Sequence, residues 1–337
     1  MSDREYSFYT WNLKDYLSTD TDTDTYRYAA VVDVIRELGA TVIAVQEVTA
    51  ASQAAAMAQM ARLADLTGMT ATVSAGGPGE AASDRPVYAG GAGGNRFATG
   101  LLWARDTSVR VHPDSFRVYG GSDFFHSLTK VDLTIGGERM TVASGHYCPI
   151  GQPRRASEAK RVVSAMPLDG LGLVGSDGNT IGFARVPDGM GGYRFYDDDP
   201  YASRPWQPGF VHTCTWTTDE RGEIVAHQAD REAARILAAG GLHDVAPTIG
   251  AEWTPTAGHQ PHRCARHRSP HRLHPRHRRN DEAGHPLRGA QHGASPVRQR
   301  PHARRRVLGP GPLTAGGTRR CRHRPGARLE RTTGHLR

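Results

Sequence analysis

The sequence predicts an α/β domain over residues 1–258, and three observations support that fold class. Residues 7–11 and 41–45 are rich in β-branched and aromatic side chains, which favour strands. Apolar side chains recur over residues 31–38 at i, i+3, i+4 and i+7, the spacing of a helix with one buried face. Residues 131–144 alternate in polarity on both sides of a Gly-Gly turn, which is typical of a β-hairpin.

The same signals predict the remaining elements of the domain. We expect further helices at residues 51–66, 153–166 and 228–239, and further strands at residues 99–103 and 171–174. Residues 76–94 are rich in glycine and nearly free of large apolar side chains, which predicts a loop.

The charge of the chain changes sign near residue 258. Residues 1–258 carry 22 Lys and Arg against 31 Asp and Glu, a net charge of −9. Residues 259–337 carry 20 Arg and no Lys against 3 acidic residues, a net charge of +17, so the whole chain carries +8. The second part also has 11 His and no Phe, Tyr, Trp, Ile or Met. Such a segment cannot bury enough apolar surface to offset the entropy of ordering it, so we expect a disordered basic tail at residues 259–337.

No stretch of the sequence reaches the roughly 18 apolar residues that a membrane span needs, and no apolar segment follows the charged N-terminus. We therefore expect a cytoplasmic protein without a membrane span, and a monomer. The cysteines (Cys148, Cys214, Cys264 and Cys321) contain no CxxC pair, so the sequence indicates neither a disulfide framework nor a strong zinc site.

Polar side chains recur where the predicted strands end. They are Asn12, Glu47, His146, Asp177 and Asn179. Because strand ends converge on one edge of an α/β sandwich, these side chains can share a site. Carboxylate and amide oxygens are the ligands that Mg²⁺ prefers, and His and Asn can donate hydrogen bonds to a phosphate. Taken singly, each residue has a plain alternative as a solvated carboxylate, a structural histidine or a turn.

The order of these residues resembles four successive motifs of the endonuclease/exonuclease/phosphatase superfamily, the fold of deoxyribonuclease I, bacterial sphingomyelinases and inositol-polyphosphate phosphatases. The family writes them as W/F-N, Q-E, H-x-x-P and G-D-x-N. In this chain they read Trp11-Asn12, Gln46-Glu47, His146 with Pro149, and Asp177-Gly178-Asn179. One departure is Ser176, which stands where the family usually has Gly. The resemblance covers about residues 6–258 and implies a four-layer α/β sandwich, with two facing mixed sheets flanked by helices.

The resemblance also implies a role for each residue in a metal-dependent phosphoesterase, most similar to a nuclease. Glu47 would be the principal ligand of Mg²⁺, or of Mn²⁺ in its place, and Asn12 would orient the metal or a phosphate. His146 would contact the scissile phosphate or act as general acid. Asp177 would align the attacking water, and Asn179 would bind phosphate. The metal would stabilise charge that develops on the phosphoryl oxygens.

Two further residues near predicted strand starts, Arg96 and His126, are candidate phosphate contacts. A salt bridge or a surface role is the alternative for each. The substrate stays open among nucleic acid, a phospholipid head group and a small phosphate ester.

Two C-terminal motifs of the family are missing. The family has R-I-D-Y-I, whose Asp helps to hold the site, and S-D-H, whose His acts as general base or stabilises the transition state. Neither occurs after Trp253. Without them the metal site and the acid/base pair are incomplete, so the strands that carry them should be missing or disordered.

The composition of the tail suggests a frameshift near residues 258–263. Arg, His, Pro, Leu and Gln have codons that begin with C, as expected when GC-rich third positions are read as first positions. Residues 270–274, read from the second base of each codon, are compatible with R-I-D-Y-I. Residues 299–306 in the same frame are compatible with S-D-H-T-P-V-V. Codon degeneracy admits other readings, but both motifs fall in one frame and in the expected order.

Three other hypotheses remain for the chain. A tail of +17 attracts phosphate backbones, so the protein can be a nucleic-acid binder, although the tail lacks the aromatic residues typical of single-strand binders. Cys264, His267, Cys321 and His323 can bind zinc, but in a spacing that matches no familiar finger. The chain can also be a catalytically impaired member of the family.

Overall fold

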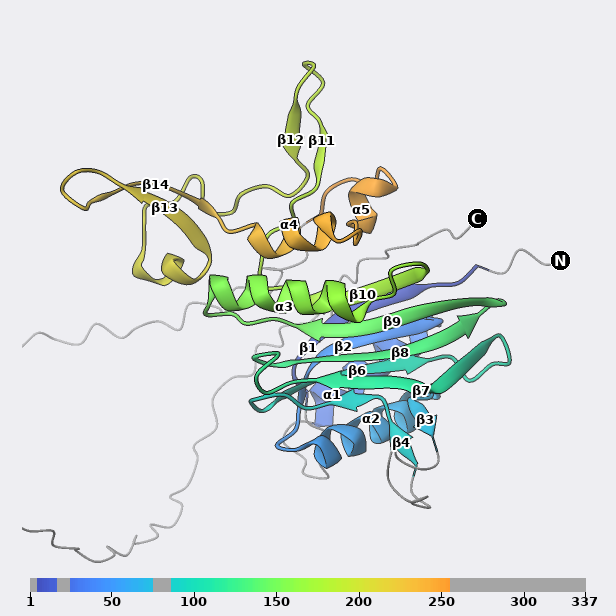
Figure 1. Ribbon diagram of the computed structural model, residues 1–337. Helices are drawn as coiled ribbons and strands as arrows, with labels where there is room; N and C mark the ends of the chain where they lie inside the picture. The colour runs from blue at the N-terminus through green and yellow to red at the C-terminus, as the bar shows by residue number, and fades with distance from the viewer. Residues whose placement is uncertain (1–4, 17–24, 75–85, 255–337) are drawn as a thin grey trace, which may run out of the picture. The chain divides into compact units, whose positions relative to one another are not determined.

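The computed structural model describes residues 5–16, 25–74 and 86–254, and for residues 25 and 26 it describes the backbone alone (Figure 1). The predicted tail at 259–337 and its boundary at residue 258 lie outside the described residues and stay predictions. In the part of the chain that is described, no helix is long and apolar enough to cross a membrane.

The first sheet contains the N-terminal strands. Its order is β1 (Phe8–Tyr16), β2 (Val42–Thr49), β6 (Phe97–Trp103) and β5 (Gly90–Gly91). β1 and β2 are parallel, and the other neighbours are antiparallel, so the sheet is mixed. The apolar run of β2 is buried on both faces, as expected for a central strand between a helical layer and a second sheet.

The second sheet has the order β10 (Leu171–Asp177), β9 (Glu138–His146), β8 (Ser127–Ile135) and β7 (Val109–Tyr119). β8 and β9 form the predicted hairpin, and β10 is parallel to β9. The inner faces of the two sheets pack against each other. Side chains such as Ala44 and Leu101 from the first sheet join Val131, Leu133 and Val142 from the second in one apolar core.

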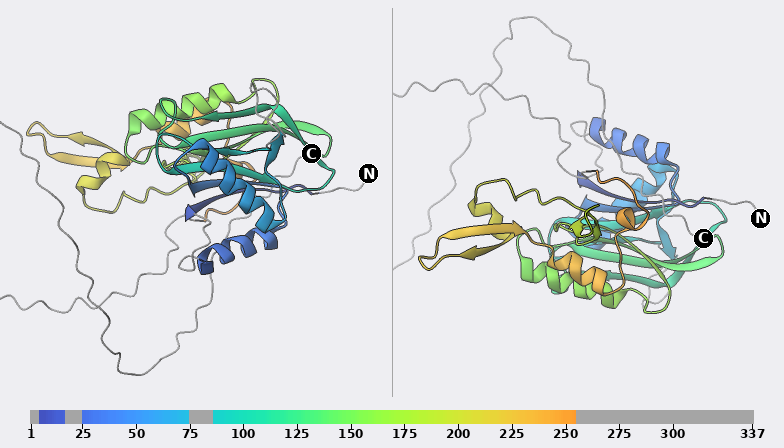
Figure 2. Two further views of the ribbon diagram at one scale, coloured as in Figure 1. Left: turned by 90° about the horizontal axis from the view of Figure 1, so that it is seen from below. Right: turned by 90° about the horizontal axis from the view of Figure 1, so that it is seen from above.

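Helices cover the outer faces of both sheets, which confirms the predicted four-layer sandwich. Figure 2 shows α1 (Thr25–Leu38) and α2 (Gln53–Thr67) on the side of the first sheet and α3 (Gln152–Ala165) on the other side. The buried face of α2 packs in the same cluster as residues of α1 and β2. α3 packs on the second sheet, and α4 (Glu232–Ala239) packs against α3.

Smaller elements lie outside the two sheets. They are the strand pair β3 (Thr72–Ser74) and β4 (Val87–Tyr88), the hairpin β11 (Arg185–Pro187) and β12 (Tyr193–Phe195), the hairpin β13 (Cys214–Thr218) and β14 (Ile224–Ala229), the 3₁₀ helix η1 (Pro208–His212) and α5 (Val245–Thr248). Figure 1 shows both hairpins on the side of α3 and α4.

Two sequence predictions need correction. The helix predicted at residues 228–239 begins at Glu232, because residues 228 and 229 end β14 and Asp230 accepts a hydrogen bond from the Glu232 amide (3.1 Å). The glycine-rich segment at residues 76–94 is not a loop throughout. Its described part contains β4 and β5, because the glycines of β5 allow close packing on α2, where a Cβ at Gly90 would lie 2.6 Å from the Ala56 carbonyl oxygen.

One edge strand of each sheet carries residues of the predicted site. β1 is the edge of the first sheet and β10 is the edge of the second within the described residues, where no later strand joins either sheet. The two edges pack closely at Gly175, where a Cβ would lie 2.7 Å from the Cβ atoms of Thr10 and Ala44. This close approach brings the C-terminal ends of β1, β2 and β10 together.

Candidate functional site

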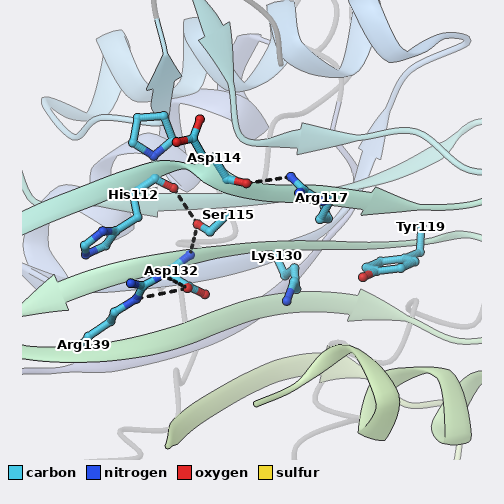
Figure 3. Close-up of a pocket in the computed structure, with 9 residues that line it drawn as sticks. His112, Asp114, Ser115, Arg117, Tyr119, Lys130, Asp132 and Arg139 are labelled. Carbon is cyan, nitrogen blue, oxygen red and sulfur yellow. Dashed lines mark hydrogen bonds and ion pairs between the residues drawn. The ribbon is translucent and has the colours of Figure 1, made fainter. Parts of the chain in front are cut away.

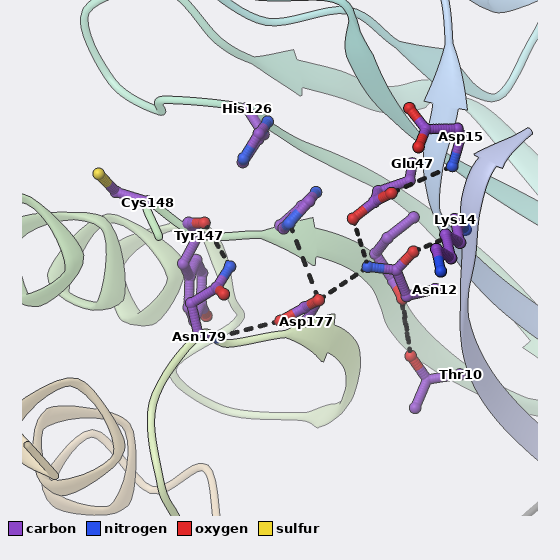
Figure 4. Close-up of polar contacts among 12 residues, drawn as sticks. Thr10, Asn12, Lys14, Asp15, Glu47, His126, Tyr147, Cys148, Asp177 and Asn179 are labelled. Carbon is purple, nitrogen blue, oxygen red and sulfur yellow. Dashed lines mark hydrogen bonds and ion pairs between the residues drawn. The ribbon is translucent and has the colours of Figure 1, made fainter. Parts of the chain in front are cut away.

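Four strands bring together four of the predicted site residues. His146 and Asp177 end β9 and β10, whereas Asn12 and Glu47 do not follow their strands as predicted but lie inside β1 and β2, because each strand continues beyond a register shift. Asn12 lies beside Gln46 in the register of β1 and β2, and Asp177 lies beside His146 in the register of β10 and β9. One side-chain ligand atom from each of Glu47, His146 and Asp177 lies within 4.8 Å of the others. Figure 4 shows Asn12 and Glu47 from the first sheet pointing toward Asp177 from the second.

The amide of Asn12 links the two carboxylates. Its Nδ2 donates to Glu47 Oε1 (2.9 Å) and to Asp177 Oδ2 (2.8 Å). Its Oδ1 accepts from the Lys14 backbone amide (2.8 Å). This hydrogen bond fixes the orientation of the Asn12 amide, so that its nitrogen faces the carboxylates. Asn12 Nδ2 therefore lies between two carboxylates, that of Glu47 from the first sheet and that of Asp177 from the second.

A buried glutamine holds the two sheets together directly beneath the site. Gln46 is 1% exposed, and its Nε2 donates to Thr10 Oγ1 (3.2 Å), to Ser144 Oγ (3.1 Å) and to the Gly175 carbonyl (3.4 Å). These partners come from β1, β9 and β10. The Gln of the Q-E motif is thus a structural tie that fixes where the neighbouring Glu47 lies.

The backbone of the site adopts conformations that side-chain-bearing residues usually avoid. Lys14, Asp15, Glu47 and Asn179 have positive φ angles of 51°, 57°, 56° and 46°. Asn tolerates this region better than the others, and such conformations cost about 1–3 kcal/mol each and gather at functional sites. Three of the four fall where the pairing of β1 with β2 and of β2 with β6 shifts register. These bulges turn Glu47 toward the strand ends.

The carboxylate of Glu47 has a second fixed contact. Its Oε2 accepts from the Asp15 backbone amide (3.1 Å), while the Asp15 side chain pairs with Arg96 (2.7 Å). Arg96, predicted as a phosphate contact, therefore lies at the rim of the site with 65% of its side chain exposed and a carboxylate as its partner.

Asp177, the last residue of β10, and Asn179, two residues later, are linked by a hydrogen bond at the site. Asp177 Oδ1 accepts from the Asn179 amide (3.1 Å), and Asn179 Nδ2 donates to the Tyr147 carbonyl (2.9 Å). Asn179 is therefore brought to the site, with one hydrogen of its side-chain amide engaged by backbone.

His146 is buried (3% exposed) and its nearest charged partner is Asp177, with Nε2 3.8 Å from Oδ2. Burial lowers the pKa of His146, and the nearby carboxylates of Asp177 and Glu47 oppose this shift without cancelling it. Burial therefore favours the neutral form of the His146 imidazole, which can donate one hydrogen bond.

His126 lies against His146 rather than at an open surface. It is 3% exposed, and the two rings stack with centroids 3.8 Å apart and planes 11° from parallel. Burial, and then the neighbouring His146, lower the pKa of His126 to about 3. Sequence reasoning named both histidines but missed their contact.

The donor set fits a divalent cation. Glu47 and Asp177 offer carboxylate oxygens close together, and among the described residues neither forms an ion pair with Lys or Arg. Hard divalent cations bind such oxygens, and His146 can contribute a nitrogen. Glu47 and Asp177 would hold the ion, which would supply positive charge next to a bound phosphate.

A separate depression of about 510 Å³ lies on the outer face of β7, β8 and β9 (Figure 3). Its cations already have partners: Arg139 pairs with Asp132 (2.7 Å), Lys130 donates to the Ala165 carbonyl (2.7 Å), and Arg117 donates to the Asp114 carbonyl (2.8 Å). The depression is therefore a solvated polar face of the sheet, and it contains none of the strand-end residues.

Solved structures similar to this chain include three examples. They are truncated TDP2 from Caenorhabditis elegans (TM-score 0.36, 18% identity, 55% of this chain and 67% of that chain), an endonuclease/exonuclease/phosphatase family protein from Bacteroides thetaiotaomicron (0.36, 13%, 53% and 63%) and a mannosyl-6-phosphatase from the same organism (0.35, 10%, 52% and 66%). One of them carries the name of the family that the strand-end motifs resemble.

The chain spans about two thirds of the length of each of these structures. No family model and no curated protein matches the sequence.

Proposed function

We propose that the strand-end site belongs to a metal-dependent phosphoesterase that cleaves phosphoester bonds by attack of water, with a nuclease-like activity. The observation that carries this proposal is the meeting of Glu47, Asp177 and His146 around the Asn12 amide, on strands that come from two different sheets. Two carboxylates at one point are costly unless a cation or donor lies between them, and Asn12 is the only described residue whose side chain donates to both.

Each residue of the site then has a task. Glu47 and Asp177 would hold Mg²⁺ or Mn²⁺, which would stabilise negative charge on the phosphoryl oxygens. Asp177 would also accept a hydrogen bond from the attacking water and orient it. Neutral His146 would donate a hydrogen bond to a phosphoryl oxygen, and the second hydrogen of the Asn179 amide would do the same.

The chain as written lacks S-D-H, so we propose that its activity is impaired relative to a version in which the reading frame is restored after residue 258. Asp177 would orient the water, but burial lowers the pKa of both His146 and His126, so neither is well suited to protonate the leaving group. The described residues would therefore still bind the metal, whereas turnover would be impaired.

Calorimetric titration with Mn²⁺ and Mg²⁺ tests the metal-binding half of the proposal on the chain as it stands. We expect one site, weakened at least tenfold by Glu47→Gln, because the substitution keeps the shape of the side chain and removes its charge. Glu37→Gln, at an exposed position of α1, is the matched control and should not change the affinity. Equal affinity in all three proteins would show that Glu47 does not hold a metal.

A further inference from the structure

The stacked pair of histidines has an asymmetric set of hydrogen bonds. His126 Nδ1 contacts Asn95 Oδ1 (2.9 Å). By contrast, His146 Nδ1 is buried without a hydrogen-bond partner among the described residues, and its Nε2 is 3.8 Å from the nearest carboxylate oxygen, beyond hydrogen-bond distance. The plane of the His146 ring is therefore fixed by packing against His126 and not by a hydrogen bond of its own.

The bonds of Asn95 determine the tautomer of His126. Asn95 Nδ2 donates to the Phe125 carbonyl (2.7 Å), and its Oδ1 accepts from the Phe97 amide (2.9 Å). These two bonds leave only one orientation of the amide, in which an oxygen faces His126. His126 Nδ1 must then carry the proton, and its Nε2 is a lone-pair acceptor.

The surroundings prevent His126 from moving away from this position. Gly93 lies directly against the His126 backbone, where a Cβ would come within 1.1 Å of the His126 carbonyl oxygen. The Phe97 ring contacts both imidazoles, with centroids 5.6 Å from His126 and 6.4 Å from His146. The ring of His126 is therefore a rigid platform for His146.

We propose that Asn95 and His126 are positioning residues, which hold the His146 imidazole in a fixed plane at the carboxylates through a chain of one hydrogen bond and one ring stack. The role in catalysis rests on the proposed phosphoesterase function, but the positioning itself does not. In most sites a hydrogen bond to the second ring nitrogen orients a functional histidine, and here a second imidazole takes over that task. His126 is then no direct phosphate contact, unlike the expectation from the sequence.

Imidazole ¹H–¹⁵N correlation spectra of the full chain test the positioning without any need for turnover. In the wild-type protein we expect His126 as the Nδ1–H tautomer. Asn95→Ala should convert it to a mixture of tautomers and should shift the signals of His146. Asn95→Asp keeps the oxygen that accepts from His126 Nδ1 but loses the donor to the Phe125 carbonyl, so it should preserve the Nδ1–H tautomer and restore the His146 signals only in part.

His126→Phe retains a ring for the stack and provides a second variant if Asn95→Ala does not fold. We expect it to preserve the His146 signals more closely than His126→Ala does. His227→Phe, in the aromatic cluster with Trp206 and Phe210, is the control and should leave the His146 signals in place. An Nε2–H tautomer of His126 in the wild type, or unchanged His146 signals in both Asn95→Ala and His126→Ala, would overturn the proposal.

Hydrolysis separates this inference from the proposed function. If the protein turns over, Asn95→Ala should lower kcat about tenfold to a hundredfold with little change in KM, because small displacements of a catalytic group are costly. Asn95→Asp should restore part of the loss, because it keeps the acceptor for His126 but not the donor to the Phe125 carbonyl. The spectra can agree with the expectation while neither the wild type nor any variant hydrolyses phosphoesters. In that case the positioning of His146 stands and the phosphoesterase assignment fails.

Discussion

At the scale of single residues, the site is a set of hydrogen bonds that hold charged groups close together. Asn12 lies between Glu47 and Asp177, and Gln46 beneath it ties the strands that carry them. The sequence predicted that these side chains would meet, because a polar residue that follows an apolar run can be recognised from the sequence. It did not predict that β1 and β2 continue past Asn12 and Glu47. It did not reveal Asp15 or Asn95, because each acts through a bulge or loop that no local pattern marks.

The first prediction concerns Asn12. Asn12→Asp replaces a donor to two carboxylates by a third carboxylate, so in EDTA we expect a loss of about 2 kcal/mol, given that hydrogen bonds to charged groups contribute about 1.5–3 kcal/mol and that the site is partly exposed. Added Mn²⁺ should restore more stability to this variant than to the wild type. Thermal melts with and without Mn²⁺ measure both effects, with Gln207→Glu as an exposed control. A variant as stable as the wild type in EDTA would contradict the assigned role of Asn12.

The second prediction concerns pH. Burial depresses the folded-state pKa of His126 to about 3 and also lowers that of His146. The unfolded chain therefore binds more protons below pH 6.5, and stability should fall as the pH decreases from 6.5 toward 3. Between pH 7.5 and 5, the melting temperature of His126→Phe should fall less than that of the wild type. Parallel curves for the two proteins would exclude a neutral buried His126.

At the scale of secondary structure, α2 and the β8–β9 hairpin were the most predictable elements. Ser52 caps α2 by accepting from the Ala55 amide, Gly68 closes it with a φ of 74°, and a two-glycine turn joins the strands of the hairpin. The start of α4 was not predictable, because the strand residues before Asp230 continue the same apolar spacing as the helix. The short strand β5 was also hidden, since its glycines resemble loop residues and pair only through tertiary contact with β6.

The third prediction concerns the edge of the second sheet. In the described residues β10 pairs on one side only, and Leu171 at its start is 41% exposed. Unpaired apolar edges promote association between molecules, and a charge on the edge suppresses it. Leu171→Lys should therefore slow aggregation measured by light scattering, with a change in stability within about 0.5 kcal/mol. Leu66→Lys, at a similarly exposed position of α2 (38%), should not slow it.

At the scale of the whole molecule, the fold class follows from strand and helix patterns up to residue 258, while the charge pattern divides the chain there. The two edge strands β1 and β10 both carry site residues, Asn12 and Asp177, so strands added at these edges would reach the site. The motifs compatible with the second reading frame of residues 259–337 would lie on or beside strands in the family. Restoring that frame should therefore change both the stability of the sheets and the activity of the site.

The fourth prediction follows from this arrangement. A chain with the frame restored after residue 258 should bury the β1 and β10 edges and unfold at a higher denaturant concentration, with a larger m-value because more surface is exposed on unfolding. Urea titrations followed by circular dichroism compare the two chains, and the chain ending at residue 258 is the control. Equal midpoints and m-values would argue against missing strands.

The most direct test of the central claim is Mg²⁺-dependent hydrolysis of bis-p-nitrophenyl phosphate and plasmid DNA by this chain, by the frame-restored chain, and by Glu47→Ala in each. We predict cleavage by the restored chain, strongly reduced cleavage by the chain as written, and none after Glu47→Ala. Cleavage by the chain as written that depends on Glu47 would show that other residues replace the missing pair. The absence of phosphoester cleavage by every version would contradict the claim that the strand ends form a phosphoesterase site.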